Sequence, residues 1–129
     1  MKIYKNAWFA KFARKERIGD AALREAVDRA ERGLIDADLG GGVIKQRVAR
    51  EGKGKSGGYR TLIFFRQAER AIFAFGFAKS ERANLNDGEL AELKMLAKAL
   101  LALSPQGMEL EIEARKLQEV HGDDQDLQE

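Results

Sequence analysis

With 129 residues, 44% of them hydrophobic, and a net charge of +2, the chain is long enough to bury one hydrophobic core. It has no cysteine and a single histidine, which excludes disulfides, thiolate chemistry, a His/Cys metal cluster and a serine–histidine–aspartate triad. No apolar run approaches the roughly 20 residues of a membrane span, and the first residues do not resemble a secretory signal. We therefore expect a cytoplasmic protein that binds no membrane and needs no metal or cofactor.

The net charge conceals two regions of opposite sign. Residues 1–82 contain 19 Lys and Arg against 10 Asp and Glu, a net charge of +9. Residues 83–129 contain 4 against 11, a net charge of −7. A basic body is typical of proteins that bind a polyanion. The acidic end either competes for the basic surface or keeps the domain in solution, and charge alone does not choose between these.

The N-terminal third is predicted to hold one strand and two helices. Residues 2–9 mix β-branched and aromatic residues and predict a strand that runs into a short helix. A second helix is predicted from Asp20, a suitable N-cap, with apolar residues at helical spacing as far as Leu34 and with Gly33 where a helix would stop. Residues 40–42 are three glycines and break the chain again.

Three strands are predicted in the middle of the chain, at residues 43–50, 59–65 and 71–77. Residues 51–58 contain four glycines and no apolar residue, which predicts a flexible loop between the first two strands. A short polar turn at residues 67–70 joins the second strand to the third. Strands connected in this way form an antiparallel meander.

The last part of the chain is predicted to pack one helix on this sheet. Asn86 and Glu89 have the spacing of a capping box, and the leucines that follow recur at helical spacing until Pro105 marks the end. The apolar residues Met108, Leu110 and Ile112 alternate weakly with polar ones, and no element is assigned there. Residues 121–129 are acidic and are predicted to be disordered.

The predicted fold class is α+β, with a small antiparallel meander packed against N-terminal helices and a C-terminal helix. We place this domain at residues 1–103, and a C-terminal extension with an acidic end at residues 104–129.

A set of basic residues on the meander is the most informative chemical feature. Lys45 and Arg47 are two apart on one strand, so they project from the same face, and Arg60 begins the next strand. Lys79 and Arg82 follow the third strand, whose end a meander brings back toward the first two. Clustered cations bind phosphates through charge and through paired arginine hydrogen bonds. The alternative is a solvated charged face, although neighbouring cations repel one another unless an anion lies between them.

Other kinds of site are weaker candidates. A P-loop is excluded because Ala49 stands where its first glycine belongs and a strand follows where a helix is needed. His121 lies in the acidic end, and Asp36 and Asp38 before the glycines are more typical of a loop than of a magnesium site. Cleavage of RNA remains, because the ribose 2′-OH is a built-in nucleophile that cations can orient and assist. A lysine desolvated among cations can serve as the base.

Several stretches resemble the RelE/ParE toxin superfamily and, more specifically, its HigB-like branch. They are residues 8–13 (Trp-Phe-Ala-Lys-Phe-Ala), 40–47 and 75–84, together with Gly-Tyr-Arg at 58–60. The resemblance covers about residues 1–103. It implies a RelE-like fold and the toxin of a type II toxin–antitoxin pair, neutralised by a cognate antitoxin that we expect to be a helix-turn-helix protein. It further implies an mRNA endoribonuclease that acts on ribosome-associated transcripts.

The resemblance also assigns roles to individual positions. Lys45 and Arg47 match the paired basic residues on the first meander strand. Arg60 matches the arginine that contacts phosphate, and Lys79 lies in the basic segment after the last strand.

Two positions depart from the family pattern. Ser80 stands where RelE-like toxins carry an arginine, and Arg82 is the candidate substitute. Asn86 stands where they place a tyrosine that stacks on the substrate base, and Tyr59 is the candidate there. The expected catalytic residues are Lys45, Arg47, Arg60, Lys79 and Arg82, and the expected RNA-binding residues are Arg50, Lys53, Lys55 and Tyr59.

Two functions of other classes stay open. ParE-like members of the superfamily inhibit DNA gyrase by binding it, without catalysis. A non-catalytic RNA- or partner-binding module could also retain the basic sheet. An assay for cleaved transcripts beside a gyrase supercoiling assay separates all three.

Overall fold

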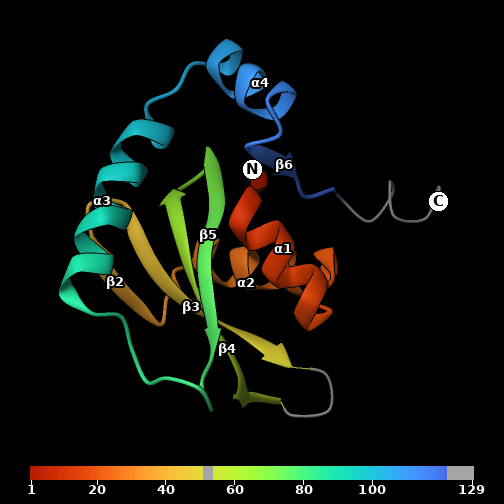
Figure 1. Cartoon of the computed structure of the whole chain (residues 1–129), viewed down its shortest axis with the longest axis vertical. Coiled ribbons are helices and arrows are strands. Elements are labelled where there is room, and N and C mark those ends of the chain that lie inside the picture. The colour runs from red at the N-terminus through yellow and green to blue at the C-terminus, as the bar shows by residue number, and fades with distance from the viewer. Residues whose placement is uncertain (51–53, 122–129) are drawn as a thin grey trace.

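One mixed β-sheet forms the centre of the fold, with helices on both of its faces (Figure 1). The computed structural model describes residues 1–50 and 54–121, and only the backbone of residues 54–56. These residues form, in chain order, β1 (Lys2–Asn6), α1 (Ala7–Glu16), α2 (Asp20–Glu31), β2 (Ala37–Gly40), β3 (Val43–Arg50), β4 (Gly54–Arg66), β5 (Arg70–Ala78), α3 (Asp87–Leu101), α4 (Pro105–Glu113) and β6 (Leu117–Glu119).

The described strands make a six-stranded sheet in the order β2-β3-β4-β5-β1-β6. The predicted meander is confirmed, because β3, β4 and β5 pair antiparallel in sequence order. The first strand, β1, lies parallel to β5, and β6 pairs antiparallel with the far side of β1. The predicted α+β fold is therefore confirmed, with a larger sheet than the sequence pattern indicated.

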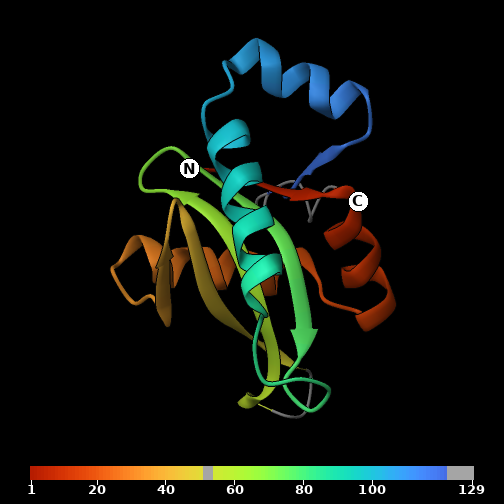
Figure 2. The same ribbon diagram turned by 60° about the vertical axis from the view of Figure 1, so that its left-hand side comes forward.

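Two hydrophobic cores hold the helices to the sheet. One core lies under α1 and α2 and contains Phe9, Leu23 and Ile63. The other lies under α3 and α4 and contains Phe64 and Leu93. Figure 2 shows α3 crossing one face of the sheet with α2 behind the other. Successive residues of a strand therefore meet different helices, and a functional side chain belongs to one face only.

The second helix begins one residue earlier than the N-cap prediction. Gly19 is the N-cap and Asp20 is the first helical residue. The carboxylate of Asp20 instead accepts a hydrogen bond from Lys5 Nζ at 3.1 Å, which joins α2 to β1. The helix ends before Gly33, whose φ of +85° suits glycine. Leu34 lies beyond that end and is exposed, so its assignment to the helical stripe was wrong.

The three glycines at residues 40–42 make a turn between two strands, and the strand before them was not predicted. Their φ angles of +84°, +63° and +84° are those of a turn that favours glycine. A Cβ on Gly42 would also lie 2.7 Å from the side chain of Leu101 on α3. The short strand β2 pairs with β3 ahead of this turn. A four-residue strand carries too little alternation to be recognised from sequence.

The predicted loop at residues 51–58 is wrong for residues 54–58, which form the first part of β4. Residues 51–53 lie outside the described part of the chain. The backbones of β3 and β4 approach closely here, and only glycine fits at residue 58, because a Cβ on Gly58 would lie 2.2 Å from the backbone oxygen of Val48. The glycines that suggested flexibility are thus a sign of close approach between β3 and β4.

The C-terminal part differs from the sequence prediction. The capping box of α3 is confirmed, but Pro105 begins a further helix, α4, in which residues 108–112 are helical. The weak alternation of residues 108–112 therefore belongs to a helix. Met108, Leu117 and Val120 are all buried, so the packed core extends to residue 120 rather than ending near residue 103. The acidic end predicted to be disordered is residues 121–129, and all of it after His121 lies outside the described part of the chain.

Candidate anion-binding face of the sheet

The register of the meander brings three of the predicted basic residues together. Arg47 on β3 lies directly opposite Arg60 on β4, and Lys45 lies opposite Leu62 one step along the same face. On the other side of β4, Arg60 lies opposite Phe77 of β5. Opposite residues of an antiparallel pair share a face of the sheet. Lys45, Arg47 and Arg60 therefore lie on the face that α3 partly covers.

Arg60 is the most unusual member of this group. Its Nη1 atom is buried and has no hydrogen-bond partner among the described residues. A buried donor without a partner costs roughly 1–3 kcal/mol, and more when it is charged. The positive charge of Arg47 on the adjacent strand adds repulsion rather than relief. An anion bound on this face would supply the missing acceptor and screen the repulsion, so the site is suited to a phosphate.

Lys45 is half-buried and reaches the segment that follows β5. Its Nζ atom lies 3.5 Å from the side-chain oxygen of Asn84. Lys79 is exposed immediately after β5, and its backbone N–H donates to the Gly58 carbonyl at 3.3 Å. The end of the meander thus returns beside the first two strands, which is the arrangement that the sequence predicted for Lys79.

Arg82 differs from Arg60 because each of its three guanidinium nitrogens already donates a hydrogen bond. Its Nη1 and Nη2 atoms bind the carboxylate of Glu89 at 3.1 and 2.5 Å, and Nε and Nη2 donate to the Asn84 carbonyl. Its guanidinium also lies over the ring of Phe77, 5.2 Å from the centroid. The hydrogen bond with Arg82 lowers the pKa of Glu89, and the bond with Glu89 raises the pKa of Arg82. Arg82 therefore fixes the β5–α3 segment, and a catalytic role would require it to leave these partners.

Tyr59 points away from the basic face. It is only 2% exposed and belongs to the core under α1, as expected for the residue next to Arg60 on a strand. Its hydroxyl donates to the carboxylate of Glu16 at 3.0 Å. Burial, followed by the hydrogen bond to Glu16, raises the pKa of Tyr59. The interpretation of Tyr59 as a substitute for a base-stacking tyrosine is therefore wrong on geometric grounds.

Among the other expected RNA-binding residues, Arg50 does not join the central group. Arg50 lies over the ring of Tyr59, 5.8 Å from its centroid, on the α1 side of the sheet. The side chain of Lys55 and the whole of Lys53 lie outside the described part of the structure. Their expected contacts with RNA stay predictions.

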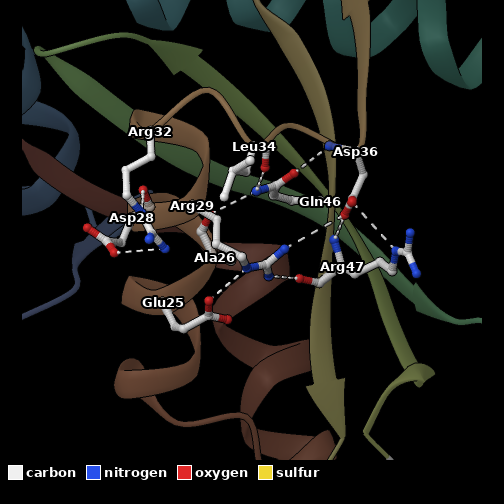
Figure 3. Close-up of polar contacts among 9 residues, drawn as sticks. All are labelled: Glu25, Ala26, Asp28, Arg29, Arg32, Leu34, Asp36, Gln46 and Arg47. Atoms are coloured by element: carbon white, nitrogen blue, oxygen red, sulfur yellow. Dashed lines mark hydrogen bonds and ion pairs between the residues drawn. The ribbon is translucent and has the colours of Figure 1, made fainter.

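A carboxylate that sequence reasoning assigned to a loop anchors Arg47. Asp36 Oδ2 accepts the backbone N–H of Arg47 at 2.6 Å, and Oδ1 lies 3.6 Å from Arg47 Nε (Figure 3). Arg29 approaches the same carboxylate at 4.0 Å and donates to the Arg47 carbonyl at 2.5 Å. Glu25 accepts from Arg29 Nε at 2.7 Å. Asp36 thus orients Arg47 and offsets part of its charge.

Gln46 holds this edge of the sheet from the opposite face. It is fully buried, and its Nε2 donates to the carbonyls of Ala26 and Leu34 at 2.9 and 3.1 Å (Figure 3). Its Oε1 accepts the backbone N–H of Asp36 at 2.9 Å. The sequence does carry a signal for this role, because Gln46 is polar at an inward position of a strand. Buried polar side chains of this kind are almost always hydrogen-bonded.

The described residues contain no group of three or more His, Cys, Asp or Glu side chains that could hold a metal ion. None of the helices in the described ranges has the length and apolar character of a membrane span.

The chain is thus a small α+β protein whose sheet carries a candidate anion-binding face around Arg60. The family model of the RelE toxin of the RelE / RelB toxin-antitoxin system matches residues 1–120, so the chain belongs to the RelE toxin family. It is accordingly the toxin of a type II toxin–antitoxin system, with an antitoxin as its partner. No curated protein matches the chain. The predicted membership of the RelE/ParE superfamily is confirmed, and the HigB-like branch stays a prediction.

Proposed function

We propose that this toxin is a metal-independent endoribonuclease that cleaves messenger RNA on the ribosome in the cytoplasm. The observation that carries the proposal is the buried Nη1 of Arg60, which has no hydrogen-bond partner among the described residues and lies on the sheet face that also presents Lys45 and Arg47. Membership of the RelE family, whose members are generally endoribonucleases, supports it. A purely structural arginine would be expected to find acceptors within the fold, as Arg82 does.

In the proposed reaction the ribose 2′-oxygen attacks the adjacent phosphorus and the bond to the 5′-oxygen breaks. The products are a 2′,3′-cyclic phosphate and a 5′-hydroxyl, so no water is consumed in this step. Arg60 binds the non-bridging oxygens, where negative charge grows in the transition state. In this proposal the proton of the attacking 2′-hydroxyl passes to a water molecule, and Lys45 gives a proton to the leaving 5′-oxygen. Arg47, which lies opposite Arg60 and is paired with Asp36, adds positive charge.

Induced expression in bacteria tests this proposal against its alternatives. We expect growth to halt while many transcripts become shorter and DNA supercoiling stays normal. Halted growth with intact transcripts and blocked supercoiling would instead assign the chain to the gyrase inhibitors of the superfamily. Arrest with neither effect would leave a non-catalytic binding module.

The predicted antitoxin is a helix-turn-helix protein encoded beside the toxin. Its co-expression should restore growth, and the two proteins should co-purify. A neighbouring gene product that neither binds nor protects would reject this part of the proposal.

A further inference from the structure

A row of aromatic side chains continues the basic face of the sheet toward the start of α1. Phe77 lies opposite Arg60, and Phe75 lies opposite Leu62 one step further along the same face. Trp8 packs on Phe75 with ring centroids 4.5 Å apart, and Phe75 lies 6.3 Å from Phe77. Phe77 belongs to the core under α3, whereas Trp8, which also stacks on Phe12 with ring centroids 5.3 Å apart, keeps 45% of its surface exposed.

The position of Trp8 follows from the length of β1. The parallel pairing of β1 with β5 stops at Lys5 and Phe73, so the next residues of β5 have no strand beside them on that edge. The chain turns into α1 at this point, with Asn6 as its N-cap and with its Nδ2 donating to the Ala74 carbonyl at 3.0 Å. Trp8, in the first turn of α1, therefore lies at the uncovered edge of β5.

A groove of about 290 Å³ opens between Trp8 and α3. Its apolar walls include Trp8, Phe75, Leu93 and Leu96, and Glu92 stands on its rim. The carboxylate of Glu92 makes no hydrogen bond or ion pair with any described residue. The neighbouring Glu89 carboxylate is occupied by Arg82 and by the backbone N–H of Asn86. The groove thus offers a flat aromatic wall, an apolar opposite wall and one free hydrogen-bond acceptor.

We propose that this groove binds a base of the RNA substrate, stacked on Trp8, with Glu92 accepting a hydrogen bond from an exocyclic amino group. The inference rests on the proposed function, since it places the base next to the phosphate held by Arg60. Phe75 and Phe77 are two residues apart on β5, about 7 Å along the strand, which is within the reach of one nucleotide.

Charge decides which part of the RNA occupies the groove. The carboxylates of Glu89 and Glu92 repel a phosphate, whereas a neutral base carrying an amino group is attracted to a free acceptor. Aromatic side chains stack on bases of every kind, so Trp8 provides affinity for any base. Glu92 provides the preference for a base that carries an exocyclic amine. Adenine, cytosine and guanine carry exocyclic amines and uracil does not. We therefore expect uracil to bind most weakly.

Trp8 is the only tryptophan in the chain, so its fluorescence reports on the groove directly. The full-length toxin is titrated at low salt with short 2′-O-methyl oligocytidine, which lacks the nucleophilic hydroxyl and is not cleaved. Oligouridine and an abasic oligomer of the same length serve as matched ligands. We expect strong quenching with oligocytidine, weaker quenching with oligouridine and none with the abasic oligomer, which should still bind through its phosphates.

Two substitutions separate stacking from selection, with binding followed by anisotropy of labelled RNA. Trp8→Ala should weaken oligocytidine binding by at least about fivefold. Glu92→Ala, at an exposed position that does not endanger folding, should remove the preference for oligocytidine over oligouridine. Met95→Ala is the control, because Met95 is 75% exposed on α3 outside the groove and should change neither value.

The outcomes distinguish this inference from the proposed function. RNA that binds in an Arg60-dependent manner, with unchanged Trp8 fluorescence and with full affinity in both groove variants, overturns the groove and leaves the nuclease proposal standing. Quenching by the purified antitoxin but not by RNA also overturns it, and makes the groove a protein-binding surface. Oligomers that bind neither wild type nor variants overturn the groove as a base-binding site, whereas the proposed function is tested separately by cleavage on the ribosome.

Discussion

Replacing Arg60 with methionine should make the protein more stable while it removes most of the activity. Methionine keeps a long apolar side chain on the sheet but removes the guanidinium, whose Nη1 is buried without a partner among the described residues. It also removes the like charge opposite Arg47. Replacing a side chain that stabilises the fold lowers the free energy of unfolding. Replacing one that is kept only for function can raise it.

The expected magnitude follows from these two terms. Relief of one unsatisfied buried donor is worth about 1–3 kcal/mol, and loss of a like-charge pair on adjacent strands adds a few tenths. The free energy of unfolding should therefore rise by about 1–3 kcal/mol, and the melting temperature by roughly 4 °C for each kcal/mol in a domain of this size. Loss of a phosphate contact that strengthens in the transition state should lower the cleavage rate by about 30- to 1000-fold.

Urea unfolding of the two purified proteins measures stability, and cleavage of messenger RNA on programmed ribosomes measures activity. Arg82→Met is the matched control, because the donors of Arg82 are satisfied by Glu89 and the Asn84 carbonyl. That variant should lose stability rather than gain it. An Arg60→Met protein that is less stable than wild type and equally active would refute the assignment of Arg60 as the phosphate-binding residue.

Three further predictions concern the frame that holds the site. Gly58→Ala should lower the free energy of unfolding by about 2–3 kcal/mol or prevent folding, because the new Cβ meets a β3 backbone oxygen at 2.2 Å; a neutral result in urea unfolding would contradict the close approach of the strands. Gln46→Leu removes one buried and two part-buried hydrogen bonds to the backbone and should cost about 2–4 kcal/mol by the same measurement; an unchanged unfolding midpoint would show that Gln46 does not hold this edge. Arg82 holds the pKa of Glu89 below its usual 4.5, so the stabilisation is complete above pH 4.5 and disappears as the pH falls through the lower folded value. As the pH falls through this acidic range, the free energy of unfolding should decrease less in the Glu89→Gln variant than in wild type. Equal decreases in the two proteins would show that Glu89 does not contribute to this pH dependence.

The meander and the capping box of α3 were predictable because each carries a local signal. Alternation marks β4 and β5, and Asn86 with Glu89 marks the helix start. The alternation of a strand also decides faces: it places Lys45 and Arg47 together and turns Tyr59 away from Arg60. The same alternation, applied to Tyr59 in the sequence, is enough to exclude it from the basic face.

The remaining elements depend on contacts between distant segments. The first part of β4 is stabilised by backbone pairing with β3, so its glycines carry no apolar pattern. The strand β6 is recognisable only because it pairs with β1. The ion pair between Arg82 and Glu89 depends on how the β5–α3 segment folds, and the exposure of Trp8 depends on where β1 ends. Composition and residue spacing do not reveal these contacts between distant segments.

The chemical form of the cut ends tests the central claim most directly. Ribosomes programmed with a defined messenger RNA are incubated with the purified toxin, with the Arg60→Met variant and with the toxin bound to its antitoxin, all without added metal beyond what the ribosome requires. We expect fragments with a 2′,3′-cyclic phosphate and a 5′-hydroxyl from the wild-type toxin, and almost none from the variant or the complex. Intact RNA with the wild-type toxin, or cut ends that are equally abundant with Arg60→Met, would contradict the account.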